Sequence, residues 1–123
     1  MNTTLWVLQS LIAFGFMYSG INKSIFSEKK LVAMGQTGVE GLPLALIRFI
    51  GISEILGAVG IILPLLLHIL PFLTTVSAIC FAVIMILAAR IHYKRHEYKS
   101  VVFNSVIFLV CIFIAYGRIA FTN

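Results

Sequence analysis

Residues 48–64, RFIGISEILGAVGIILP, are apolar along most of their length but carry Arg48 at one end and Glu54 near the middle. The wider apolar run from 43 to 66 is close to the roughly 20 residues that cross a bilayer core as an α-helix. A charged side chain inside a membrane helix is costly and usually faces the protein interior or a water-filled cavity. The stretch therefore predicts a membrane helix with an inward-facing carboxylate.

Three further apolar runs have the length of a membrane helix, from about 4 to 22, 70 to 92 and 100 to 119. Of the 123 residues, 61% are hydrophobic and only 11% are charged, whereas a typical soluble chain is about 25% charged. This chain lacks the charge to cover a surface that faces water. We expect an all-α membrane protein, a four-helix transmembrane bundle that forms a single domain over residues 1–123.

The basic residues are unevenly distributed between the two ends of these helices. Eight of the nine Lys and Arg residues lie in or beside the connections 23–42 and 93–99, and only Arg118 lies at the opposite end. The positive-inside rule therefore predicts that both connections are cytoplasmic and both termini lie outside. We expect the apolar helices to contact the lipid bilayer. We expect no nucleic-acid partner, because such a partner would require a basic face on a soluble module.

Small and polar residues recur at helical spacing in the last two apolar runs. One stripe holds Thr74, Ser77, Ala78, Phe81, Met85 and His92, and the other holds Ser100, Asn104, Cys111, Ala115 and Arg118. Lipid offers such residues no partners, so membrane helices turn them toward neighbouring helices. These stripes predict a packed bundle and are weak evidence for function.

Glu54 lies eleven residues after Pro43, which places it about 16 Å into the membrane, near the midplane. Its carboxylate needs a charged partner, water or a proton at that depth. Arg48 is roughly 9 Å away along the axis and about 120° around the same helix, so a direct ion pair is not expected. Gln9 comes within about two residues of the same depth, and we expect it to donate a hydrogen bond to Glu54. Arg48 is expected to reach the interface or to turn into the bundle beside Asn104.

Besides the level of Glu54 and Gln9, a group of polar residues is expected on the cytoplasmic side of Glu54. Its members are Tyr18, Asn22, Lys23, Arg48, Arg90, His92 and Asn104. We predict a ligand-binding pocket open to the cytoplasm and lined by Glu54, Arg48, Gln9, Tyr18, Asn22, Lys23, His92 and Asn104. Two plainer interpretations stay open: Glu54 as a buried residue that fixes helix pairing, and His92 as an anchor at the membrane interface.

Catalytic and metal-binding motifs are not found in the sequence. It contains no cluster of metal ligands, no phosphate-binding loop and no spaced nucleophile and base, so we expect no catalytic residues, no metal and no covalently bound cofactor. Cys80 and Cys111 fall at about the same depth, but Cys80 lies roughly 120° from the stripe of its own helix. We interpret them as two unrelated buried thiols.

Several motifs together resemble those of a known family. The run LPLALIRFIGISEILGAVGIILP (42–64) is followed by a second proline, by ILAARIHYKRHEYKSVVFN (86–104) and by AYGR (115–118), and GINKSIF (20–26) contains a G-x-x-K element. In this order they resemble the DoxX-like family of small bacterial membrane proteins over nearly the whole chain. The resemblance implies a four-helix membrane bundle in a bacterial cytoplasmic (inner) membrane. The family's pattern also points to Lys23, Glu54, His92 and Asn104 as candidate site residues.

The resemblance also implies a class of function. The family name comes from a membrane subunit associated with thiosulfate:quinone oxidoreductase, and related members are linked to membrane redox complexes and oxidative stress. It implies a subunit that binds a small hydrophobic ligand, with quinone as the candidate, alongside membrane or redox partner subunits or further copies of itself. Any enzymatic role would be that of a subunit in an oxidoreductase.

Two alternative functions stay open. One is a non-catalytic factor that assembles or stabilises other membrane proteins. The other is a small proton-coupled exporter, against which two features argue: the acid lies in the second helix, and the strong charge bias opposes dual topology.

Overall fold

The computed structural model describes residues 1–120, and four of the helices in this range are long and apolar enough to cross a membrane. These four are α1 (Asn2–Ile25), α3 (Leu44–Leu67), α4 (Phe72–Lys94) and α5 (Tyr98–Ala120). The described residues contain no strand. The all-α fold with four transmembrane helices is thus confirmed.

The connection between α1 and α3 has structure of its own, with a short helix α2 (Glu28–Ala33) and a 3₁₀ turn η1 (Thr37–Val39). The helix ends also differ from those expected. α1 continues to Ile25, three residues past the predicted end, and α5 begins at Tyr98, so only residues 95–97 separate it from α4. The extension of α1 changes which residues lie opposite Glu54.

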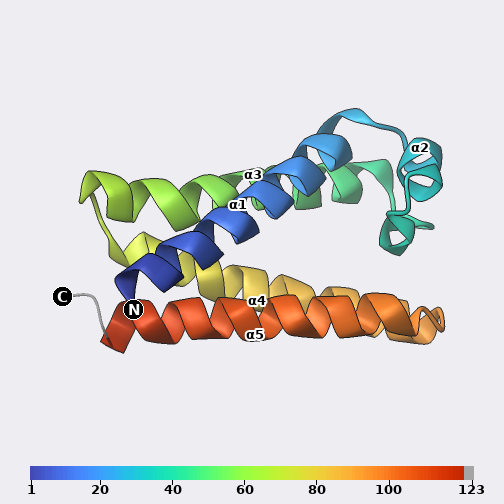
Figure 1. Cartoon of the computed structure of the whole chain (residues 1–123). Coiled ribbons are helices and arrows are strands. Elements are labelled where there is room, and N and C mark those ends of the chain that lie inside the picture. Colours follow the sequence, from blue (N-terminus) through green and yellow to red (C-terminus); the bar gives the residue numbers. More distant parts are fainter. Residues whose placement is uncertain (121–123) are drawn as a thin grey trace.

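The four long helices form two layers (Figure 1). α1 and α3 make one layer and pack on each other, while α4 and α5 run side by side in the other. α1 crosses obliquely, so that its N-terminal end approaches the C-terminal end of α5. We call this end of the bundle the termini end, and the end with α2, η1 and the 95–97 turn the loop end.

The core lies between the two layers and is built from small and apolar residues. Phe16 of α1 stacks on Phe81 of α4, with 3.8 Å between ring centroids and 7° between planes. Gly57 makes room for the Phe81 ring, because a Cβ at Gly57 would come within 2.5 Å of it. Most of the two predicted stripes is buried in the structure: Thr74, Ala78, Phe81 and Met85 on α4, and Asn104, Cys111, Ala115 and Arg118 on α5.

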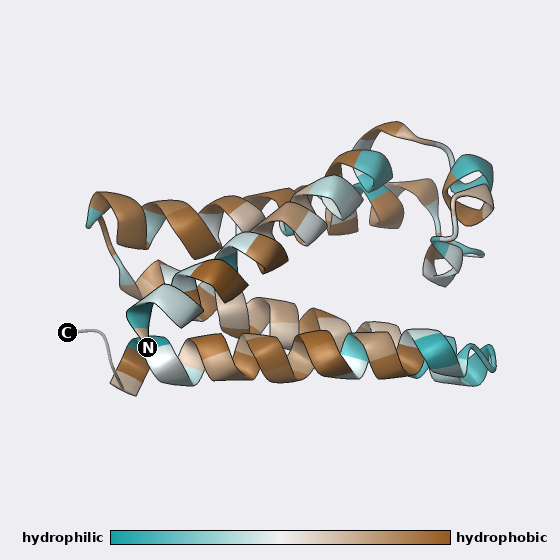
Figure 2. Cartoon of the chain, in the orientation of Figure 1, coloured by the Kyte–Doolittle hydropathy of each residue, from teal (hydrophilic) through white to brown (hydrophobic). Residues whose placement is uncertain are grey.

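The outer faces of the long helices are predominantly apolar, whereas hydrophilic residues gather at the loop end (Figure 2). Such faces are suited to lipid contact, which makes this an integral membrane protein. Both cysteines are free thiols. Cys111 is buried as expected, but the expectation of a buried Cys80 was wrong: its position off the inward stripe of α4 leaves it exposed on the outer surface.

α1 and α3 touch through their backbones at two glycines. A Cβ at Gly20 would lie 2.6 Å from the Gly51 carbonyl oxygen, and a Cβ at Gly51 would lie 2.8 Å from the Gly20 carbonyl oxygen. Small residues allow this close approach of membrane helices. The contact fixes the level of α1 against α3 and places the last turns of α1 opposite Glu54.

Candidate functional site

The centre of the site is an ion pair between Lys23 of α1 and Glu54 of α3. Lys23 Nζ lies 2.8 Å from Glu54 Oε1, and the Glu54 side chain is only 2% exposed. Ser19, one turn before Lys23 on the same face of α1, donates from its hydroxyl and lies 3.3 Å from both carboxylate oxygens. A buried carboxylate is tolerated when it is paired and hydrogen-bonded, so these two residues account for a charge inside an apolar helix.

Arg48 makes no contact with Glu54 and instead stabilises the end of α1. Its Nη1 donates to the carbonyl oxygens of Lys23 at 2.8 Å and Phe26 at 2.6 Å. The last carbonyls of a helix lack partners within the helix, and a guanidinium satisfies them well. The expectation that Arg48 and Glu54 form no direct pair is confirmed. The side chain joins α3 to the turn that carries Lys23.

Three helices present polar residues where their core faces continue toward the loop end. Glu54 comes four residues before the core residue Ala58, His92 comes seven residues after Met85, and Asn104 comes seven residues before Cys111. These spacings keep each residue on the inward face of its helix. Together with Ser19, Asn22 and Lys23 of α1 they form what we call the polar layer.

Two amides of the polar layer are buried with unused donors. Asn22 is 6% exposed and Asn104 is 7% exposed. Within residues 1–120, neither Nδ2 atom has a hydrogen-bond acceptor. Asn22 is a surface neighbour of Ser19 on α1, because residues three apart in a helix lie side by side. Buried polar groups are nearly always hydrogen-bonded, so each of these two nitrogens needs an explanation.

The connection between α2 and α3 closes the polar layer at the loop end. The Ser19 hydroxyl lies 3.5 Å from Gln36 Oε1. Gly38 packs on the His92 ring so closely that a Cβ there would lie 3.3 Å from ring atoms Cε1 and Nε2. His92 Nδ1 in turn lies 2.9 Å from Glu97 Oε1 in the α4–α5 turn. The predicted site residue His92 thus lies under this connection.

The expectation that Gln9 donates to Glu54 was wrong. Its Nε2 donates to the Ile61 carbonyl oxygen at 2.7 Å, and its Oε1 accepts from Arg118 Nε at 2.6 Å, nearer the termini end. The depth count assumed that α1 ends near residue 22 and runs level with α3. Because α1 is longer and meets α3 through Gly20, Ser19 and Lys23 occupy the level that was assigned to Gln9.

Tyr18 and Arg90, two members of the layer expected from the sequence, do not belong to the polar layer of the structure. Tyr18 is 60% exposed and Arg90 is exposed as well. Since successive residues are turned by about 100° around a helix, Tyr18 points away when its neighbour Ser19 faces Glu54. Ser19 and Gln36 are the site residues that sequence reasoning missed. Ser19 shares a helix face with Lys23, which could have identified it, whereas Gln36 lies in a connection without periodicity.

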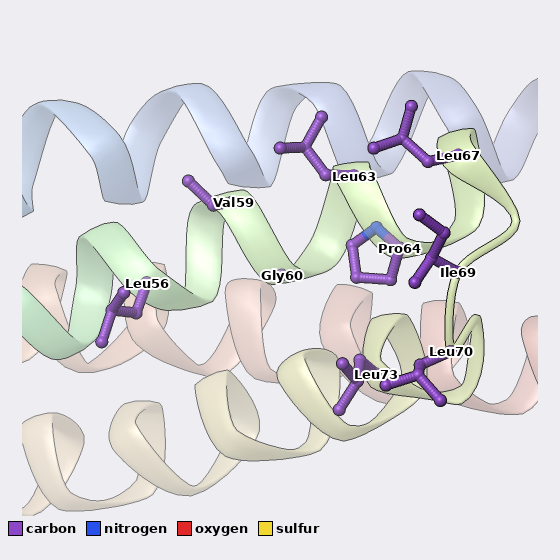
Figure 3. A pocket seen from close by; sticks show the side chains of 9 residues that line it. All are labelled: Leu56, Val59, Gly60, Leu63, Pro64, Leu67, Ile69, Leu70 and Leu73. Atoms are coloured by element: carbon purple, nitrogen blue, oxygen red, sulfur yellow. The ribbon is translucent and has the colours of Figure 1, made fainter.

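A shallow apolar hollow of about 320 Å³ lies elsewhere, where α3 turns into α4 (Figure 3). Its lining runs from Leu56 to Leu73 and consists of apolar residues with Pro64 and Gly60. This hollow is suited to hydrocarbon and is separate from the polar layer. Within residues 1–120, no three His, Cys, Asp or Glu side chains are grouped to hold a metal.

A family comparison decides what this bundle is. The model of the DoxX-like family matches residues 7–114. The chain belongs to the DoxX-like family. The DoxX-like match includes all of the polar layer, from Ser19 to Asn104, and stops short of Arg118. Comparison with curated proteins and with solved structures found no match.

Proposed function

We propose that this DoxX-like protein binds a small hydrophobic ligand that carries hydrogen-bond acceptors, such as a quinone, in its polar layer. The observation that carries the proposal is a pair of buried amides, Asn22 on α1 and Asn104 on α5, whose Nδ2 donors have no acceptor within residues 1–120. Both belong to the polar layer that also holds the Lys23–Glu54 pair. A buried donor without an acceptor costs roughly 1–3 kcal/mol, which a ligand oxygen would recover.

The surroundings favour a ligand with a polar head and an apolar body. The polar layer offers amide, hydroxyl and ammonium donors, and the apolar core around Phe16, Phe81 and Met85 begins next to it. Small-molecule sites are mostly apolar with a few placed polar groups. Quinone carbonyl oxygens would accept from the amides, and the Lys23–Glu54 pair could hold or exchange a proton beside them.

The cellular setting is part of the same proposal. The protein would act as a subunit of a redox or stress-related complex in the inner membrane, with the loop end in the cytoplasm as the charge distribution predicts. Partner subunits or further copies would supply any redox centre. The contact between Lys23 and Glu54 disfavours the exporter alternative. In such an exporter one carboxylate binds a proton and the substrate in turn, and here the Lys23 ammonium would compete with both for Glu54.

Asn104→Leu tests the proposal. In lipid nanodiscs, a short-chain ubiquinone should raise the thermal unfolding midpoint of the wild-type protein. At a quinone concentration of a hundred times Kd, binding should add about 2.7 kcal/mol to the free energy of unfolding. The variant, which loses an unpaired amide, should be about 1–3 kcal/mol more stable without quinone and should no longer respond to it.

The matched control is Ser105→Ala, because Ser105 is the next residue on α5, is exposed and donates its hydroxyl to the Val101 carbonyl oxygen of the same helix. It should respond to quinone as the wild type does. The proposal fails when the wild-type midpoint does not move, or when Asn104→Leu destabilises the protein and keeps the quinone response.

A further inference from the structure

The segment from 35 to 41 bends across the loop end between two glycines with left-handed backbone conformations. Gly35 has φ +98° and Gly41 has φ +85°. Only glycine adopts such angles without strain, so the turns at both ends of the segment depend on these residues. Between them lies η1, set between the two helix layers at the loop end (Figure 1).

This segment covers the polar layer directly. Gln36 approaches the same Ser19 hydroxyl that bonds Glu54, and Gly38 lies on the His92 ring. Val39 is 4% exposed and packs with Leu31 of α2 and Ile47 of α3. At the loop end the segment thus lies over Ser19 and His92, and beside them the Lys23 side chain is 16% exposed and the Glu54 side chain 2% exposed.

Polar contacts tie the segment to the α4–α5 turn. The Thr37 hydroxyl donates to Glu97 Oε2 at 2.7 Å. Arg95 forms two ion pairs, one from Nε to Glu97 Oε1 at 3.1 Å and one from Nη2 to Glu40 Oε1 at 3.0 Å. The hydrogen bonds from Thr37, His92 and Arg95 lower the pKa of Glu97 to about 2, so its carboxylate is charged at neutral pH. The Arg95–Glu40 pair lies at the surface, where water readily replaces such bonds, whereas Thr37 and Glu97 are half-buried.

A hollow of about 460 Å³ adjoins these contacts. It is lined by Gly35 and Thr37 on one side and by residues 96–100 on the other. Gly35 and Thr37 thus border open space, into which the first part of the segment can move, whereas Val39 is packed against Leu31 and Ile47.

We infer that residues 35–41 are a hinged lid, and that release of Thr37 from Glu97 opens the polar layer to a ligand arriving from the loop end. The identity of that ligand rests on the proposed function. The opening of the lid does not, because Lys23 bonds the same Glu54 carboxylate as Ser19, the residue that Gln36 contacts, and acylation of its amine reports exposure without any ligand.

Acylation of Lys23 measures this opening without any ligand. The full chain in nanodiscs is treated with a water-soluble, amine-reactive ester, and peptides are quantified by mass spectrometry with the exposed Lys29 as internal reference. Thr37→Val should raise the relative rate at Lys23 by roughly three- to tenfold, the change expected when one hydrogen bond to the closed lid is lost. Glu40→Gln should act in the same direction and more weakly, because it removes an outer contact.

Two variants separate release of the lid from general disturbance. Thr37→Ser keeps the hydroxyl and should label as the wild type does. Tyr98→Phe removes a hydroxyl that bonds His96 within the same turn and should also label as the wild type does. The inference is overturned when Thr37→Val labels Lys23 at the wild-type rate, or when Thr37→Ser raises the rate as much as Thr37→Val.

Quinone binding and lid opening are measured independently. If quinone does not bind the wild type, the proposed function fails and the labelling still decides whether the lid opens. If quinone binds, Thr37→Val should speed both its association and its dissociation. An unchanged association rate would overturn the lid as the gate.

Discussion

Glu54 keeps its place in an apolar helix because α1 provides it with both a charge and a hydroxyl. Lys23 approaches from the last turn of α1 with a long side chain, and Ser19 lies one turn below it. Desolvation of two charges is costly, and only close pairing with further hydrogen bonds offsets it. The pair is therefore sensitive to the loss of either member. It is less sensitive to the loss of both.

Removal of one charge should reveal this dependence. Lys23→Met leaves the Glu54 carboxylate buried without its cation and is expected to cost about 3–5 kcal/mol of unfolding free energy. The double variant Lys23→Met/Glu54→Gln should recover more than half of that loss, because no isolated charge is left inside. Chemical unfolding in detergent micelles, followed by circular dichroism, measures the wild type, the single variants Lys23→Met and Glu54→Gln, and the double variant.

The control for this cycle is Lys29→Met, which removes an exposed lysine of α2 and should change stability by less than about 0.5 kcal/mol. Additive losses in the double variant would mean that Lys23 and Glu54 stabilise the protein independently. In that case the ion pair does not explain the buried acid.

At the scale of the helices, the decisive contact is the one between Gly20 and Gly51. It sets how far α1 slides along α3, and so it decides that Lys23 rather than Gln9 meets Glu54. Helix packing in membranes depends on such small residues because lipid competes equally well for larger apolar side chains. A single methyl group at this point should push the two helices apart.

Gly51→Ala should destabilise the bundle by about 1–3 kcal/mol, the usual cost of overpacking. Its Cβ would lie 2.8 Å from both the Gly20 carbonyl oxygen and Lys23 Cβ. Gly15→Ala is the matched control, since a Cβ there meets nothing within 4 Å, and it should be neutral or stabilise α1 by up to about 1 kcal/mol. Equal effects of the two variants on the thermal midpoint would show that the α1–α3 contact is not tight.

The helices themselves could be predicted from the sequence, since runs of about 20 apolar residues have few other solutions. The inward stripes of α4 and α5 followed from helical spacing as well. The level of α1 could not be predicted, because a helix end that is wrong by one turn moves each facing residue by about 5 Å. Gln9 was placed wrongly for this reason, while Glu54 was correctly expected to face inward.

At the scale of the whole molecule, polarity changes along the bundle axis. The termini end holds the buried hydrogen bond of Arg118 to Gln9, and the middle holds the apolar core. The polar layer follows, and the lid with its charged contacts lies at the hydrophilic loop end (Figure 2). The sequence indicated this gradient through its charge distribution. It could not indicate the contacts of Gln36 with Ser19 or of Thr37 with Glu97, because they join distant segments without any periodic pattern.

The most direct test of the polar layer as a ligand site is photo-crosslinking with an azido-quinone in nanodiscs. Peptides are mapped by mass spectrometry with and without excess unlabelled quinone. We expect crosslinks on the segments that hold Ser19–Lys23 and Asn104, and we expect the excess quinone to remove them. Crosslinks confined to lipid-facing residues such as Phe14 and Leu109, and unaffected by competition, would contradict the account.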